Sequence, residues 1–200
     1  MERIDARMRG EQTEGAVDTG FSELDAMTGG LHGSELLILA ARPSMGKTAF
    51  AMNIAEGVAM RANAPVLFIS LEMSAIELIE RMMCSVARVN GHRLRNGTIS
   101  QEDRKRLVEK AAEISASPLY VDDSPGRTVA EIAAAARRIK RIEQANTERH
   151  SNLGLIVIDY LQLIEPDNPE IHDKSRSPRL LVASRVCLAN LMYRCCVLHS

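Results

Sequence analysis

Short apolar runs alternate along the chain with longer segments of helical periodicity. The apolar runs span residues 35–41, 65–71, 119–122 and 153–158. Each has the length of a β-strand, and the first (ELLILAA) shows no polar alternation, which predicts a strand buried on both faces. The helical segments span residues 47–61, 74–89 and 128–146, and a further one begins at Ser100. This alternation predicts right-handed βαβ units on a parallel sheet flanked by helices, an α/β fold.

Capping residues mark the start of two of these helices. Ser100 precedes Glu102 and Asp103, so its hydroxyl can accept from a free N–H group while the acids favour the positive end of the helix. Thr128 and Glu131 have the spacing of a capping box at the head of an Ala-rich segment. Both helices are therefore predicted to begin at these positions.

The segment after the first apolar run carries a phosphate-binding pattern. In a parallel α/β sheet, ligands bind beyond the carboxyl ends of the strands. The residues there are Ala41, Arg42, Pro43, Ser44, Met45, Gly46, Lys47 and Thr48. They fit the P-loop pattern G-x-x-x-x-G-K-[ST], except that Ala41 stands at the first glycine position. An ordinary turn between a strand and a helix is the alternative interpretation.

Three residues of this segment have separate chemical roles in a P-loop. Gly46 lets backbone N–H groups approach phosphate oxygens at the positive end of the following helix. Lys47 would reach the β- and γ-phosphates of a nucleotide, and the Thr48 hydroxyl would bind Mg²⁺. The segment therefore predicts a site for a nucleotide and a magnesium ion.

Acidic residues follow two other apolar runs. Asp159 ends the run at 153–158, where it would orient Mg²⁺ through bound water, although acids often end strands. Glu72 follows the run at 65–71, where its carboxylate could polarise an attacking water as a general base. From the residues alone, an ordinary acid at a helix N-terminus explains Glu72 equally well. Together with the P-loop, these positions indicate ATP hydrolysis, in which a protein positions groups and neutralises charge.

Composition narrows the class of protein. The chain has 200 residues, is 46% apolar and 26% charged, and carries a net charge of −1, which fits about one globular domain. Any nucleic-acid contact must come from a local patch, and 3% aromatic residues leave few stacking platforms. The four cysteines form no CxxC pair, and no apolar signal segment opens the chain. We therefore expect no zinc site, no membrane span and a cytoplasmic location.

Two basic segments are open to more than one interpretation. The run 137–141 (RRIKR) is interpreted as a solvated helix face rather than a nucleic-acid site. Arg88, His92, Arg93 and Arg95 flank two glycines and fit a loop near either the ligand or a neighbouring subunit. Met82, Met83 and Cys84 are interpreted as core packing.

Four stretches of the chain resemble the RecA-like motor domain of the DnaB-type replicative DNA helicases. They are residues 19–25 (TGFSELD), 38–48 (ILAARPSMGKT), 68–74 (FISLEMS) and 156–163 (IVIDYLQL). The resemblance runs from about Met1 to Pro166. The loop with Ala41 in front resembles the family's own variant of the P-loop, so the departure from the general pattern supports the resemblance.

The resemblance implies an activity and a set of partners. It implies ATP-dependent unwinding of duplex DNA by a homo-hexameric ring that moves along single-stranded DNA at the replication fork, with primosome proteins as partners. It implies ATP and Mg²⁺ as cofactors. It also implies that Glu72 is the catalytic glutamate, with Lys47 beside it in catalysis and Asp159 and Thr48 at the metal.

The two ends of the chain depart from the family pattern. Residues 1–15 resemble only the end of the linker that precedes the motor, and residues 16–166 resemble the N-terminal part of the motor domain. After Leu163 the family's helix and following strand are not recognisable, and residues 167–200 are predicted to be an aberrant, disordered or frameshifted tail. The sheet is then expected to be incomplete on its C-terminal side, with an exposed edge strand and doubtful ring assembly.

A shift of reading frame between about Pro166 and Asp173 would explain the tail. With suitable codons, residues 192–196 (MYRCC) displaced by one base read Asn-Val-Pro-Val-Leu, and residues 173–178 (DKSRSP) read Gln-Glu-Gln-Val-Ala. Both resemble family sequence at the family's spacing and in the same displaced frame. The nucleotide sequence decides between this hypothesis and a genuine tail.

Two alternatives to a helicase remain at this point. One is a nucleotide-binding remnant without enzymatic activity. The other is a RecA-like ATPase of the recombination or clock type, which shares the Thr-Gly…Leu-Asp opening; the P-loop variant and the Asp-Tyr-Leu-Gln segment argue against it.

Overall fold

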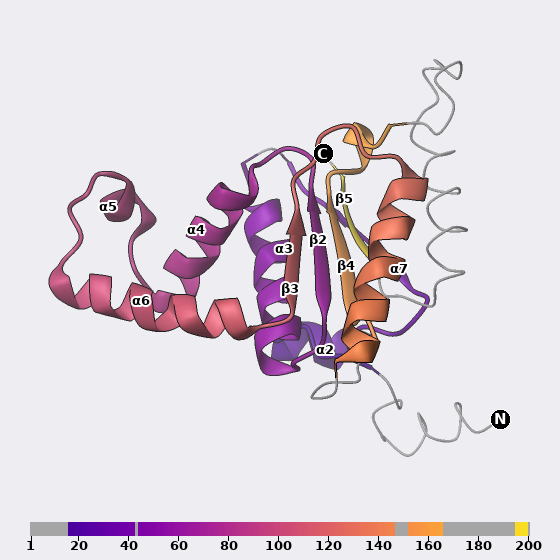
Figure 1. Ribbon diagram of the computed structural model, residues 1–200, viewed down its shortest axis with the longest axis horizontal. Helices are drawn as coiled ribbons and strands as arrows, with labels where there is room; N and C mark the ends of the chain where they lie inside the picture. The colour runs from indigo at the N-terminus through magenta and orange to yellow at the C-terminus, as the bar shows by residue number, and fades with distance from the viewer. Residues whose placement is uncertain (1–15, 43, 147–151, 166–194, 200) are drawn as a thin grey trace.

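The strands form one parallel sheet whose strand order differs from the chain order. The computed structural model describes residues 16–42, 44–146, 152–165 and 195–199. The strands are β1 (Leu36–Ala40), β2 (Val66–Ser70), β3 (Leu119–Asp122), β4 (Leu155–Asp159) and β5 (Cys195–His199). All neighbours are parallel, in the order β1-β5-β4-β2-β3 (Figure 1). The predicted α/β fold with a parallel sheet is confirmed.

Helices cover both faces of this sheet. They are α2 (Ser22–Thr28), α3 (Lys47–Glu56) with its π-helical continuation η1 (Gly57–Arg61), α4 (Ala75–Ala87), α5 (Gly91–Arg95), α6 (Gln101–Ala116), α7 (Val129–Ala145) and the short 3₁₀ helix η2 (Leu161–Leu163). Side chains of β2 alternate between two cores: Phe68 packs with α3 and α4, and Ile69 packs with α7. Every residue of β2 and β4 is buried, so these two strands form the rigid centre on which the acidic residues are mounted.

The prediction that the first apolar run is buried on both faces is wrong. The strand that it forms, β1, is only half-buried, and Ile38 is 50% exposed. The reason is its place in the sheet, because β1 is an edge strand of the five-stranded order. An edge strand has a strand neighbour on one side only, so fewer side chains surround it than surround β2 or β4.

One segment of the predicted aberrant tail, Cys195–His199, is a strand of the sheet in the structure. This segment forms β5, which pairs with β1 on one side and β4 on the other. The ladder bonds of a sheet are made by main-chain groups, which every residue except proline carries in full. An apolar run such as CCVLH can therefore take a central place. The predicted linker remnant at residues 1–15 and most of the predicted tail (166–194) lie outside the described residues.

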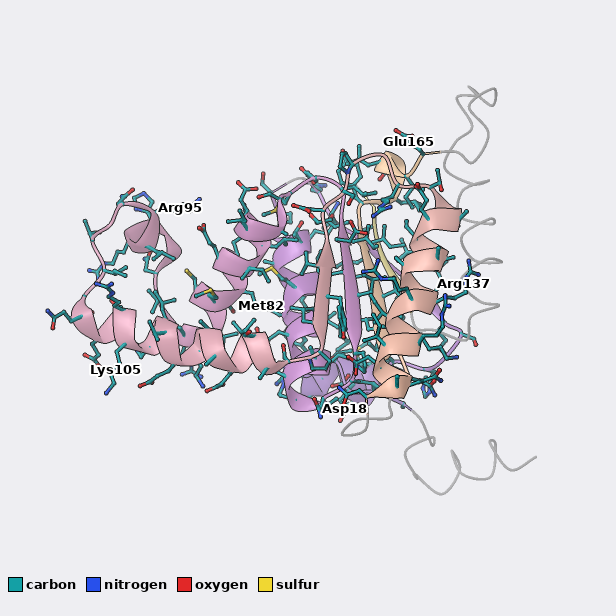
Figure 2. All side chains as sticks on the ribbon, viewed as in Figure 1. Asp18, Met82, Arg95, Lys105, Arg137 and Glu165 are labelled. Carbon is teal, nitrogen blue, oxygen red and sulfur yellow. The ribbon has the colours of Figure 1, made fainter. Side chains whose placement is uncertain are left out.

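Helices α4, α5 and α6 form a lobe that extends sideways from the sheet (Figure 1). Ala87, Val89 and Leu107 pack together as a small core of this lobe. The exposed residues Arg88, His92, Arg93 and Arg95 lie here, in and beside α5, rather than in a loop at the strand ends (Figure 2 labels Arg95).

The predicted helix caps are confirmed. Ser100 Oγ accepts from Asp103 N at 3.0 Å at the head of α6. Thr128 and Glu131 form the complete capping box at the head of α7. On α7, Arg137 is exposed, as expected for a solvated helix face (Figure 2). Among the residues that the structure describes, each helix is too short or too polar to cross a bilayer.

The carboxyl group of Asp122, at the end of β3, makes stability depend on pH. Burial acts to raise its pKa, but the Ser124 N–H group and the Arg127 guanidinium, 2.8 Å away, outweigh burial and lower the pKa. The ionised carboxylate therefore stabilises the fold above the unfolded-state pKa of about 4. This contribution is lost as the pH falls through the lower folded-state pKa.

We predict that Asp122→Asn lowers the free energy of unfolding at pH 7 by about 0.5–1 kcal/mol. The difference from wild type should shrink as the pH falls below about 4, as measured by urea denaturation. Glu109→Gln, at an exposed acid of α6, is the matched control and should give a small difference at every pH. A deficit of Asp122→Asn that stays constant down to acid pH would contradict this account.

Candidate nucleotide site

The loop after β1 opens α3 without a side-chain cap. Ser44 and Gly46 both have positive φ (64° and 81°), and Met45 N donates to Arg42 O at 3.3 Å. Gly46 is the N-cap residue of α3 and provides no side-chain hydrogen bond. The first N–H groups of this ten-residue helix therefore lack the usual capping partner and face the loop, which suits an anion such as phosphate.

The other predicted loop residues flank this turn. Ala41 is half-buried, Arg42 is exposed and Met45 is 72% exposed. Pro43 lies outside the described residues. A Cβ built on Gly46 would meet nothing within 4 Å. The glycine is thus required by its backbone conformation and leaves open space over the helix end.

The side chains of Thr48 and Asp159 meet directly. Thr48 Oγ1, in the first turn of α3, donates to Asp159 Oδ2 at 2.7 Å. Asp159 is completely buried at the end of β4, and its Oδ1 has no hydrogen-bond partner among the described residues. A buried carboxylate oxygen without a partner is costly unless a further group satisfies it. The sequence predicted that both residues bind one metal ion, and in the structure their side chains contact each other.

Lys47 lies against the residue that follows Asp159. Its Nζ is 5.3 Å from the centroid of the Tyr160 ring, which is within the range of a cation–π contact. Tyr160 was not among the predicted site residues, although its position directly after a strand-ending acid is a usable signal. The Tyr160 ring thus attracts the Lys47 ammonium group and holds it beside the loop.

Glu72 lies at the same edge of the sheet. Ser70, two residues earlier, is opposite Asp159 in the β2–β4 register, and Leu71 N donates to Asp159 O at 2.7 Å. The Glu72 side chain is exposed and forms no hydrogen bond or ion pair within the part of the chain that the structure describes. Its carboxylate is therefore available to a ligand or a water.

These residues fit a magnesium–nucleotide complex. Mg²⁺ keeps several waters and needs only one or two protein ligands when substrate phosphates supply others. The Thr48 hydroxyl and the unpartnered Asp159 Oδ1 are such oxygen donors, and the uncapped start of α3 suits the phosphates. Within the described residues no cluster of three His, Cys, Asp or Glu side chains suits a metal, so these two oxygens are the donors to consider.

The first motif of the resemblance, residues 19–25, has a structural role. Thr19 is fully buried, and its main-chain N and Oγ1 both donate to Asp25 Oδ1, at 2.9 and 2.8 Å. The turn is therefore closed by the two most widely spaced polar residues of the motif. It fixes the start of α2 and contributes no atom to the site described above.

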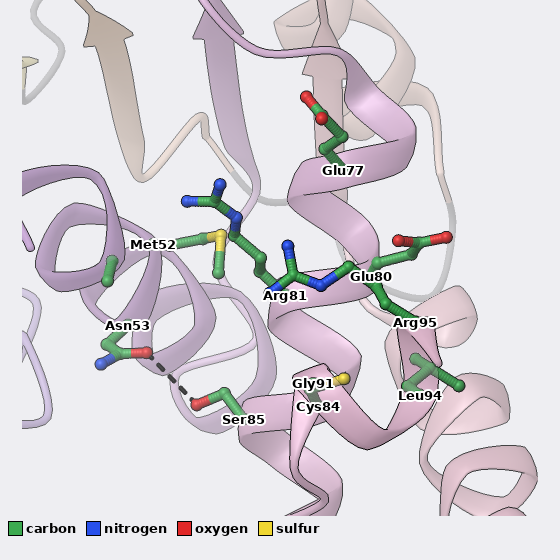
Figure 3. A pocket seen from close by; sticks show the side chains of 11 residues that line it. Met52, Asn53, Glu77, Glu80, Arg81, Cys84, Ser85, Gly91, Leu94 and Arg95 are labelled. Carbon is green, nitrogen blue, oxygen red and sulfur yellow. Dashed lines mark hydrogen bonds between the residues drawn. The ribbon is translucent and has the colours of Figure 1, made fainter. Parts of the chain in front are cut away.

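A separate pocket of about 330 Å³ lies between α3, α4 and α5 (Figure 3). Met52 and Leu94 line it, together with charged side chains such as Arg81 and Arg95. It also contains Cys84, whose thiol pKa is raised by burial and by Glu80 and is lowered in part by Arg95. This thiol therefore stays protonated near neutral pH, which makes it a weak nucleophile.

The strand order, the P-loop after β1 and the buried acid at the end of β4 define a P-loop NTPase with a RecA-like fold. The chain belongs to the DnaB-like helicase C terminal domain family, whose model matches residues 16–188. This match continues past Pro166, the predicted end of the resemblance.

Characterised relatives share this similarity. The chain is 46% identical over 149 residues to the replicative DNA helicase DnaC of Bacillus subtilis, and 44% identical over 172 residues to the replicative DNA helicase DnaB of Geobacillus stearothermophilus. These alignments cover 74% and 82% of this chain but 31% and 36% of the relatives, so the chain spans about a third of their length. A solved DnaB-like replicative helicase, studied for its interactions with primase, superposes with a TM-score of 0.85 at 28% identity, over 98% of this chain and 47% of that one.

The open space at Gly46 gives a test with a matched control. Gly97 also has positive φ (67°) and also has nothing within 4 Å of a built Cβ, but it lies in the lobe. We predict that Gly46→Ala and Gly97→Ala each lower the free energy of unfolding by about 1 kcal/mol, because alanine is strained at positive φ.

Only Gly46→Ala should also weaken ATP binding, because its methyl group would occupy the space over the helix end. Binding is measured by titration calorimetry and stability by urea denaturation. Equal ATP affinities for the two variants would contradict the placement of phosphate at this loop.

Proposed function

We propose that the chain binds ATP with Mg²⁺ and hydrolyses it as the motor of a replicative DNA helicase of the DnaB type. The observation that carries this proposal is the hydrogen bond between Thr48 and Asp159, which leaves a buried carboxylate oxygen of Asp159 free beside the P-loop. The family and the replicative helicase relatives support the same function.

Each residue of the site has one task in this function. Bound Mg²⁺ supplies charge neutralisation at the phosphates. Thr48 and Asp159 hold the ion and its waters, while the N–H groups after Gly46 bind phosphate oxygens. Lys47, whose Nζ is 5.3 Å from the centroid of the Tyr160 ring, would meet the β- and γ-phosphates. Glu72 accepts a proton from the attacking water as general base.

The partners of the full protein follow from the same proposal. We infer that the motor assembles as a homo-hexamer, moves along single-stranded DNA at the replication fork and works with primosome proteins in the cytoplasm. The solved relative that was studied for its interactions with primase supports the inference of primosome partners by analogy. The shifted reading frame between about Pro166 and Asp173 stays a proposal, and the nucleotide sequence of the gene is its test.

We predict that Lys47→Ala weakens binding of Mg²⁺-ATP at least tenfold and abolishes turnover, because it removes the charge that meets the phosphates. Glu72→Gln should keep the binding and lower turnover at least a hundredfold, as expected for a general base. Lys105→Ala, at an exposed lysine of the lobe, is the matched control (Figure 2).

Binding and phosphate release are measured on the purified chain with and without single-stranded DNA. Binding that depends on Lys47 without any turnover would identify a nucleotide-binding remnant. No binding at all, or the same loss in Lys105→Ala as in Lys47→Ala, would contradict the assignment of the P-loop.

A further inference from the structure

The orientation of Glu72 depends on the main chain around it. Residues 71–74 belong to neither a helix nor a strand. The Glu72 carboxylate has no partner among the described residues that could fix it. The position of a general base must be set to within a fraction of an ångström for efficient catalysis. The constraints on this four-residue segment are therefore functionally important.

The first constraint is the side chain of Ser70. Its hydroxyl donates to Met73 O at 2.6 Å and accepts from Met73 N at 3.2 Å. Ser70 is 1% exposed, so these bonds are shielded from water on the strand side. The hydroxyl thus closes a turn around Glu72 and ties its far end back to β2.

The second constraint is the side chain of Asp123, which reaches across from the loop after β3. Its Oδ2 accepts from Ala75 N, in the first turn of α4, at 2.8 Å. Ser74 satisfies a different N–H group of the same helix, because its hydroxyl accepts from Glu77 N at 3.3 Å. Two side chains therefore cap α4, and of these two Asp123 comes from a distant segment of the chain.

The loop that carries Asp123 is itself fixed at both ends. Asp122 accepts from Ser124 N and from Arg127. Farther along, the main-chain O of Arg127 accepts from Glu165 N at 2.9 Å, in the segment that follows β4. The loop therefore connects the Glu72 segment to the segment beyond Asp159.

We propose that Ser70 and Asp123 are positioning residues, which hold the Glu72 segment at the orientation that hydrolysis requires. This inference rests on the proposed ATPase function. Neither side chain belongs to the P-loop or to the Thr48–Asp159 pair, so their loss should affect the rate of hydrolysis and leave nucleotide affinity unchanged. Neither residue was predicted to have a role; the bond between Asp123 and Ala75 joins positions 48 residues apart, so it leaves no local signal.

Asp123→Ala is the decisive variant, because Asp123 is exposed and its loss leaves no cavity. We expect kcat for ATP, per nucleotide site counted by titration, to fall about tenfold, with KM and the melting temperature close to wild type. Asp123→Asn is the matched control, because its side-chain oxygen can still accept from Ala75 N; it should restore most of kcat. Ser70→Ala should lower kcat in the same way.

Wild-type kcat in Asp123→Ala, while Glu72→Gln in the same assay loses turnover, would overturn the positioning role and leave the proposed function standing. A fall in kcat that Asp123→Asn fails to restore, or that is matched by a rise in KM, would also overturn it. Absence of Lys47-dependent turnover in the wild-type chain would overturn the proposed function and the positioning role together.

Discussion

The hydrogen bond between Thr48 and Asp159 is the interaction on which the site depends. In the sheet, β5 separates β1 from β4, so main-chain pairing does not bring the P-loop and the buried acid together. The side chains do so, at a distance of 2.7 Å. The parallel arrangement makes this contact geometrically possible, because the carboxyl ends of all strands lie at one edge.

The two acidic residues of the site, Asp159 and Glu72, lie at the end of β4 and just beyond the end of β2, the two fully buried strands. Both β2 and β4 are covered on both faces, by α3 and α4 on one side and by α7 on the other. Rearranging Asp159 would disrupt this packing, whereas Glu72 lies just beyond β2 in irregular backbone. Asp159 is therefore held rigidly by its strand. The orientation of Glu72, in contrast, depends on hydrogen bonds made by other side chains.

Short-range sequence patterns predicted the individual strands, helix starts and site motifs of this structure. Apolar runs marked β2, β3 and β4 to within two residues, Thr128 and Glu131 marked a helix start, and the P-loop and Asp159 were identified from their places after strands. The exposed edge at Ile38 and the central place of β5 were not predicted, because strand order depends on which distant segments pair. For the same reason the bond between Asp123 and Ala75, 48 residues apart, could be found only in the structure.

The most direct test of this site is the dependence of ATP binding on Mg²⁺, measured by titration calorimetry on the wild-type chain and on two Thr48 variants. The account predicts that Mg²⁺ tightens ATP binding to the wild-type chain and to Thr48→Ser, which keeps the hydroxyl. It also predicts that Thr48→Val loses this dependence. Equal ATP affinity with and without Mg²⁺ in the wild-type chain would contradict the assignment of Thr48 and Asp159 to a metal.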